Sequence, residues 1–151
     1  NSRRSQFSQV WAQTAADYFQ IPAQCYSGGV EVTACNERTV ASLERMGFII
    51  SKQGHSNPIY FALHTQDSRP IILFSKLYDD VINPHGIFAT VITCSHADEN
   101  CPFIPGAEAR IPVRYEDPKA FDDTPEEAAQ YDARSKQIAS EMFYVFSRIG
   151  V

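Results

Sequence analysis

The chain has 151 residues, of which 44% are apolar and 21% charged, and its formal net charge is −5 at pH 7. These values are typical of one folded domain over residues 1–151 with its own hydrophobic core. They exclude bulk binding to nucleic acid, which needs a basic face, and no stretch reaches the roughly 20 apolar residues that span a bilayer. Four cysteines and no recognisable secretion signal predict a cytoplasmic protein with reduced thiols.

The first half of the chain predicts two helices and a strand. Residues 5–20 carry apolar side chains at helical spacing, which predicts a first helix. The stretch "QCYSGG" at 24–29 predicts a short strand that runs into a glycine turn. Asn36 is a typical N-cap for a helix over 37–46, and Gly47 is a typical residue to close it.

The second half predicts strands followed by a long helix. The stretches "PIYFALHT" at 58–65 and "PIILFS" at 70–75 predict a hairpin. "GIFATVIT" at 86–93 is a continuous apolar run, which predicts a central strand covered on both faces, and "ARIPVRY" at 109–115 predicts another strand. A last helix begins near Thr124-Pro125-Glu126-Glu127. Strands that alternate with helices predict an α/β fold.

The first candidate site is the opening stretch Asn1-Ser2-Arg3-Arg4-Ser5. A loop of small polar residues that leads into a helix gathers unpaired backbone N–H groups, which favour phosphate-like anions and lower the pKa of a nearby cysteine. The guanidinium of Arg4 adds a fork of donors that suits a tetrahedral oxyanion. The alternative is an exposed helix N-terminus with two solvated arginines.

The second candidate site is the stretch "TCSHADENCP", which contains Cys94 and Cys101 and follows the apolar strand. The two cysteines are too far apart for a CxxC redox pair, but the loop can bring their sulfurs together if it reorganises. Two alternatives remain open here. Instead of a redox pair, Cys94 and Cys101 are buried structural thiols, as we interpret Cys25 and Cys35, or they are zinc ligands together with His96. A structural zinc site needs a fourth ligand, so no metal site is predicted.

The third candidate site is Asp117-Pro118, which lies between a predicted strand and the last helix. A parallel sheet presents its working edge at such a position, so Asp117 is a candidate general acid. The alternative is an ordinary Asp-Pro turn.

In this order, the three stretches resemble the thioredoxin-coupled arsenate reductases, which have the low-molecular-weight tyrosine phosphatase fold. Residues 1–6 are similar to the end of the family's loop C-T-x-N-S-x-R-S-Q, and residues 94–102 to its loop C-S-x-A-D-x-N-C-P. Asp117-Pro118 is similar to its general-acid pair, and "YSGG" at 26–29 to its turn after the second strand. The resemblance implies a three-layer sandwich around a mainly parallel four-stranded sheet, with a hairpin inserted at about 55–85.

The implied activity is reduction of arsenate to arsenite through a relay of thiols. In the family pattern, a nucleophilic cysteine stands three residues before Asn1, and its role passes to Cys94 and then to Cys101. Arg4 and the backbone of residues 1–5 hold the oxyanion, and Asp117 supplies a proton. The resemblance also implies a monomer without a resident cofactor, which receives its electrons from thioredoxin or a similar dithiol protein such as a glutaredoxin.

The chain departs from the family pattern at three points. The nucleophilic cysteine and the first, central strand both precede Asn1 in the family, so we expect the natural chain to carry them upstream. Gln9 stands where several members carry a glutamate tied to a cation site, which counts against potassium binding.

The alternative activity is that of a low-molecular-weight tyrosine phosphatase, which hydrolyses phosphomonoesters through a cysteinyl-phosphate. It shares the loop and Asp117 but does not need Cys94 and Cys101. Such phosphatases usually carry tyrosines after the Asp-Pro pair, whereas "KAF" follows here. A third possibility, if no upstream cysteine exists, is a non-catalytic oxyanion-binding or thiol-sensing module.

Overall fold

The computed structural model describes residues 1–93 and 104–150. These residues form an α/β fold, as the sequence predicts. The helices are α1 (Arg4–Tyr18), α2 (Glu37–Arg45) and α4 (Glu127–Ser147), and a short 3-10 helix, η1 (Pro118–Phe121), precedes α4. The strands are β1 (Ile49–Gln53), β2 (Ile59–Leu63), β3 (Ile71–Leu73), β4 (Phe88–Ile92) and β5 (Ala107–Pro112). Among the described helices, none combines the length and the apolarity needed to cross a membrane.

The structure confirms all three predicted helices. They were predictable because their signals are local in the sequence. The Asn36 side chain accepts a hydrogen bond from the Arg38 amide at 2.9 Å and so caps α2. Gly47 follows this helix with a φ of 104°, a conformation that is costly for residues with a Cβ. The predicted start of the last helix, near Thr124, lies three residues before the observed start of α4 at Glu127.

Replacing Asn36 by alanine is expected to lower the free energy of unfolding by about 1 kcal/mol, because the first turn of α2 loses its side-chain acceptor. Denaturant unfolding of the full-length protein measures this as a shift of the midpoint at constant slope. Gln66→Ala, in the exposed β2–β3 turn, is the matched control and should leave the midpoint unchanged. Equal midpoints for the two variants would contradict the capping role.

The strands form two separate sheets in the described residues. One is an antiparallel sheet in the order β1-β2-β3, and its β2–β3 pair is the hairpin predicted at 58–75. The other is a parallel pair of β4 and β5. The predicted four-stranded, mainly parallel sheet is not found in the described residues, where the parallel part has two strands. β1 was missed because its sequence, "IISKQ", does not alternate and four of its five residues are exposed.

Two strand predictions need correction. Residues 24–29 form no strand, and their β-type pairing in the described chain is one isolated bridge between Gly29 and Leu77. The Gln13 side chain instead accepts from the Cys25 amide at 2.9 Å and donates to the Ala23 carbonyl at 3.1 Å. β4 is not covered on both faces, since Val91 is 41% exposed in the described structure.

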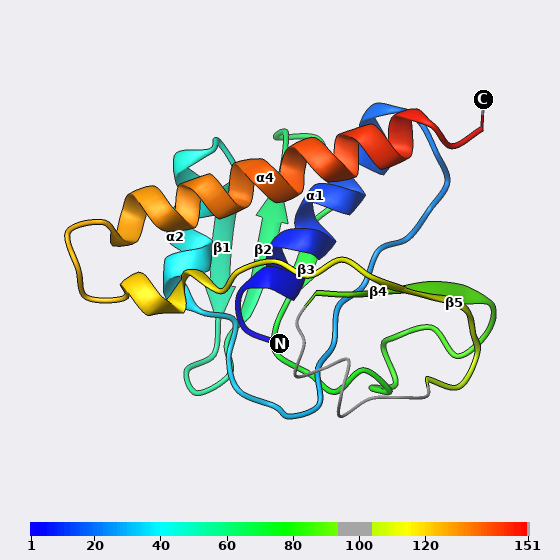
Figure 1. The fold of residues 1–151 in the computed structure, drawn as a ribbon, viewed down its shortest axis with the longest axis horizontal. Helices are drawn as coiled ribbons and strands as arrows, with labels where there is room; N and C mark the ends of the chain where they lie inside the picture. The colour runs from blue at the N-terminus through cyan, green and yellow to red at the C-terminus, as the bar shows by residue number, and fades with distance from the viewer. Residues whose placement is uncertain (94–103, 151) are drawn as a thin grey trace.

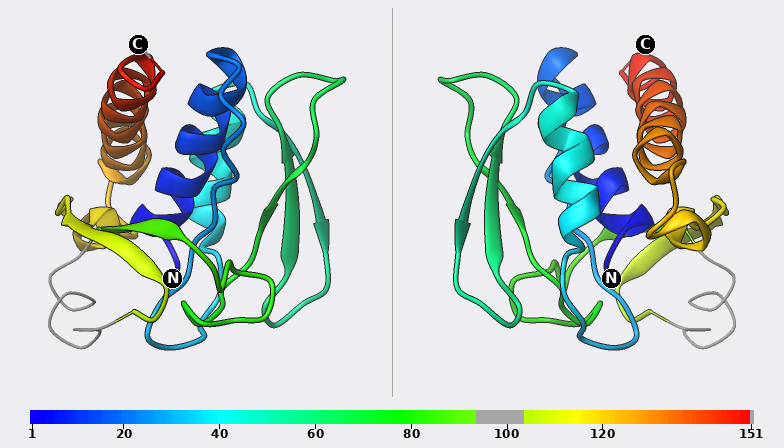
Figure 2. Two further views of the ribbon diagram at one scale, coloured as in Figure 1. Left: turned by 90° about the vertical axis from the view of Figure 1, so that its right-hand side faces the viewer. Right: turned by 90° about the vertical axis from the view of Figure 1, so that its left-hand side faces the viewer.

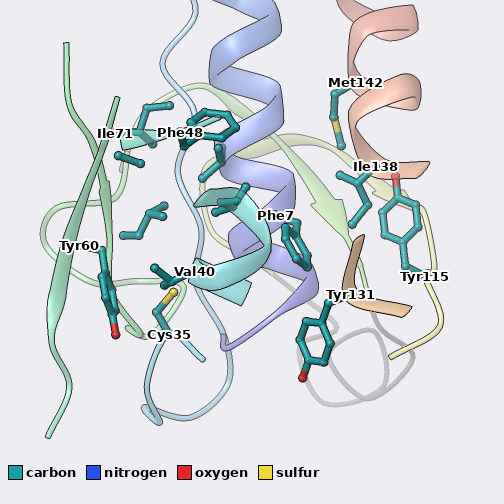
Figure 3. Packing of buried hydrophobic residues seen from close by; sticks show 14 residues of the cluster. Phe7, Cys35, Val40, Phe48, Tyr60, Ile71, Tyr115, Tyr131, Ile138 and Met142 are labelled. Carbon is teal, nitrogen blue, oxygen red and sulfur yellow. The ribbon is translucent and has the colours of Figure 1, made fainter. Parts of the chain in front are cut away.

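The layers of the molecule lie in the order α4, then α1 with α2, then the antiparallel sheet (Figures 1 and 2). The main apolar cluster fills both sides of the middle layer (Figure 3). Tyr60 and Ile71 lie on the sheet side, and Ile138 and Met142 lie on the α4 side. The start of α1, where Phe7 is fully buried, is therefore held from both directions. This packing fixes the helix that follows the predicted oxyanion loop.

Candidate functional site

The opening loop is tied to the rest of the protein through its own backbone and side chains. The Ser2 carbonyl accepts from the Asn36 amide at 2.9 Å, and Asn1 Nδ2 donates to Ser5 Oγ at 2.7 Å. No side chain among the described residues caps the start of α1. The first amides of a helix have no intrahelical acceptor, and with no side-chain cap here they remain suited to an anion.

Arg4 and Asp117 are 113 positions apart in sequence and meet in space. Arg4 Nη2 donates to Asp117 Oδ2 at 2.9 Å, and Arg4 Nη1 donates to the Tyr115 carbonyl at 3.0 Å. Their side chains are 21% and 32% exposed, so the pair is mostly buried but keeps some contact with solvent. The arrangement sets a guanidinium and a carboxyl group side by side at the start of α1.

Asp117 also begins η1, so the alternative interpretation of Asp117-Pro118 as a structural turn is correct as far as it goes. Its second carboxylate oxygen, Oδ1, accepts from the Lys119 amide at 3.1 Å and caps the short helix. Pro118 occupies the first turn, where its missing N–H costs nothing. One side chain therefore both fixes η1 and faces Arg4.

Tyr115 connects this pair to the strand that leads to the predicted redox loop. Its amide donates to the Thr93 carbonyl at 3.1 Å, while its own carbonyl accepts from Arg4. Thr93 is the residue directly before Cys94 in the sequence. Cys94 and Cys101, and with them the zinc alternative that includes His96, lie outside the described residues. Thr93, the residue next to Cys94 in the sequence, is thus hydrogen-bonded to Tyr115, which also binds Arg4.

The Arg3 side chain leaves the loop in a different direction from Arg4. Its Nε donates to the Tyr131 hydroxyl at 2.8 Å, and its Nη2 lies 3.5 Å from Asp122 Oδ2. The alternative of two solvated arginines is therefore wrong, since both side chains are largely buried and paired. Sequence reasoning missed the roles of Tyr131 and Asp122, for which no spacing or motif provided a signal.

The two described cysteines are not tuned for thiolate chemistry. Burial raises the pKa of the Cys35 thiol to about 12. Burial, and then the neighbouring Asp17 carboxylate, raise the pKa of the Cys25 thiol to about 11. Both are thus protonated at neutral pH, which agrees with their interpretation as structural residues. No cluster of three or more metal-ligating side chains occurs within residues 1–93 and 104–150.

Gln9 and Lys76 make further contacts close to the loop. Gln9, at the position of the family's cation-linked glutamate, donates to the Ile72 carbonyl at 3.0 Å and accepts from Ser27 Oγ at 2.7 Å. The Lys76 amide donates to Asn1 Oδ1 at 3.2 Å. The Lys76 side chain is 2% exposed, with its ammonium 4.8 Å from the centre of the Phe74 ring, and burial lowers its pKa. The sequence offered no mechanism for this segment, which the fold brings against the loop.

The chain is similar to curated arsenate reductases over most of its length. Arsenate reductase 2 of Staphylococcus epidermidis is 29% identical over 119 residues, which cover 78% of this chain and 72% of the relative. The arsenate reductase of Staphylococcus aureus (strain Newman) is 28% identical with the same coverage. That of Brevibacillus brevis is 27% identical over 118 residues, 78% of this chain and 70% of the relative. No family model matches the chain.

Proposed function

Because the chain is a relative of the arsenate reductases, we propose that it reduces arsenate to arsenite through a relay of cysteine thiols. The observation that carries the proposal is the Arg4–Asp117 pair at 2.9 Å, joined through Tyr115 to the residue before Cys94. A cation and a carboxyl group thus meet beside the start of α1, and Thr93, which precedes Cys94 in the sequence, hydrogen-bonds to Tyr115. The oxyanion is held by Arg4 and by the backbone of Asn1, Ser2, Arg3 and Ser5.

The first step of the proposed reaction joins a thiolate to arsenic. A cysteine three residues upstream of Asn1 attacks the arsenate, its pKa lowered by the helix start and the loop amides. The leaving hydroxide takes the proton of Asp117 and departs as water. Arg4 stabilises the negative charge that remains on the arsenic oxygens.

The next steps move two electrons from sulfur to arsenic. The Cys94 thiolate attacks the sulfur of the thiol–arsenic adduct, so that a disulfide forms and arsenic leaves as arsenite, reduced from As(V) to As(III). Cys101 then attacks Cys94, releases the first thiol and leaves a Cys94–Cys101 disulfide. Thioredoxin, or a similar dithiol protein, reduces that disulfide by thiol exchange and is oxidised in turn. In this proposal the protein acts as a monomer in the cytoplasm.

The function is tested by assaying the full-length protein with arsenate and with an aryl phosphate, each with and without thioredoxin and its reductase. Continuous arsenite formation that depends on thioredoxin is the expected result. Hydrolysis of the aryl phosphate without thioredoxin, together with no arsenite, would instead assign the phosphatase alternative, which uses the same loop and Asp117. If neither reaction is observed, the third possibility, a non-catalytic oxyanion-binding module, is the one that stands.

Replacing Asp117 by asparagine is expected to lower the rate of the first turnover about 100-fold or more, the range that a positioned general acid contributes. Asparagine keeps one acceptor oxygen, which can still cap the Lys119 amide, but it has no second acceptor for Arg4 and no carboxyl proton to give. Rapid-quench measurement of arsenite release gives the rate directly. Asp67→Asn, in the exposed β2–β3 turn, is the control. If both variants matched the wild-type rate, Asp117 would not be the acid.

A further inference from the structure

Arg3 and Arg4 are consecutive in the sequence, yet their side chains contact opposite ends of η1. Arg4 pairs with Asp117, the residue that caps the beginning of η1. Arg3 Nη2 lies 3.5 Å from Asp122 Oδ2, and Asp122 is the residue that ends η1. Because η1 has only four residues, its two ends are a single turn apart. Two adjacent arginines thus hold both ends of one short element.

A buried tyrosine strengthens the contact at the second end. The Tyr131 hydroxyl accepts from Arg3 Nε at 2.8 Å and donates to Asp122 Oδ1 at 2.7 Å. Its ring is fully buried in the main core. Burial, and then the hydrogen bond with Asp122, raise the pKa of Tyr131 to about 12. The hydroxyl therefore keeps its proton at neutral pH and remains a donor to Asp122.

An arginine of α2 completes the arrangement. Arg38 Nη1 lies 3.7 Å from Asp122 Oδ2, and its other nitrogens pair with Asp123 at 3.0 Å and Glu127 at 2.6 Å. We name Arg3, Arg38, Asp122 and Tyr131 the η1 anchor. Because its members share partners, and Arg3, Arg38 and Tyr131 come from the residue before α1, from α2 and from α4, the anchor constrains the end of η1 more than one isolated surface ion pair would.

We propose that Arg3 and Tyr131 are positioning residues for Asp117: the η1 anchor fixes the end of η1 and so holds the Asp117 carboxyl beside Arg4. The inference rests on the proposed function, in which Asp117 delivers a proton. Its basis is geometric, since Asp117 is joined to η1 by the Lys119 hydrogen bond at 3.1 Å and moves with it. A carboxyl group that is not held close to the reacting oxygen transfers its proton more slowly.

The first experiment compares hydrogen exchange in the full-length wild type and in Tyr131→Phe, which removes the bridging hydroxyl but keeps the ring. Exchange of the backbone amides at 119–123 is expected to accelerate about tenfold, since local opening costs less without the anchor. Tyr144→Phe, on the same helix but 68% exposed, is the matched control and should exchange as wild type does. Arg3→Lys, which keeps the charge but loses the fork of donors, should accelerate exchange as Tyr131→Phe does.

The second experiment is a double-mutant cycle on the rate of the first turnover. Tyr131→Phe is expected to slow arsenite release about tenfold when Asp117 is present, because even a small displacement of the proton donor from the reacting oxygen lowers the rate. In the Asp117→Asn background the same change should have little further effect, since there is no proton left to position. A merely structural role would slow both backgrounds equally.

The outcomes separate the inference from the function on which it rests. Unchanged exchange at 119–123 in both anchor variants would overturn the inference, and so would equal slowing in both Asp117 backgrounds. If the wild type forms no arsenite, the proposed function fails. The exchange measurement then still decides whether Arg3 and Tyr131 hold η1.

Discussion

Arg4→Lys is expected to reduce kcat/KM for arsenate about 100- to 1000-fold, the loss typical of removing a preorganised donor from a developing oxyanion. Arg4 uses both terminal nitrogens, one on the Tyr115 carbonyl and one on Asp117. A lysine has a single ammonium on a flexible stem and cannot hold two such partners while it also faces an oxyanion. The charge is kept, so the loss reports geometry rather than electrostatic attraction alone.

The measurement is the initial rate of arsenite formation by the full-length variant over a range of arsenate concentrations. Arg148→Lys, at the exposed C-terminal end of α4, is the matched control and should retain wild-type kinetics. If Arg4→Lys kept more than about a tenth of the wild-type kcat/KM, the fork of donors would not be the basis of oxyanion binding.

Cys101→Ser is expected to abolish steady-state arsenite formation with the thioredoxin system while leaving the first turnover intact. In the proposed relay, Cys101 acts only after arsenite has left, when it attacks Cys94 and frees the first thiol. Without its sulfur, the protein stops as a disulfide between that thiol and Cys94. The expected result is therefore a burst of one arsenite per chain, followed by no further product.

The burst is measured by quenched-flow sampling, and the trapped disulfide by peptide mapping without reduction. Cys25→Ser is the control, because burial and Asp17 hold the pKa of the Cys25 thiol near 11 and keep it out of the relay. Continuous turnover by Cys101→Ser at the wild-type rate would remove Cys101 from the mechanism and leave the electron path to another thiol.

The parts of the fold that were predictable are those that local sequence determines. Asn36 as a cap and Gly47 at a positive φ fix the two ends of α2 within a few residues of the chain. The pairing of strands depends on distant partners and was predicted less well. The stretch 24–29 has a strand-like sequence, but the Gln13 side chain of α1 binds the Cys25 amide and the carbonyl of the preceding Ala23, and no ladder forms there.

The candidate site divides in the same way. Arg4 and Asp117 were identified from the order of motifs, and the fold brings them to 2.9 Å. The partners of Arg3 were not identifiable, because Tyr131 lies 128 positions away and belongs to no motif. The sequence assigned the fork of donors to Arg4 and gave the Arg3 side chain no partner. Only the three-dimensional arrangement separates a residue that faces Asp117 from one that faces the core.

Because the side chains of Arg3 and Arg4 point to different partners, the number of residues at the start of α1 must stay fixed. Successive side chains on a helix are about 100° apart, so inserting or deleting one residue here would turn each arginine away from its own partner. Tolerance to added or removed residues should instead be found in the solvent-facing turn at 65–67, where no part of the site depends on the count.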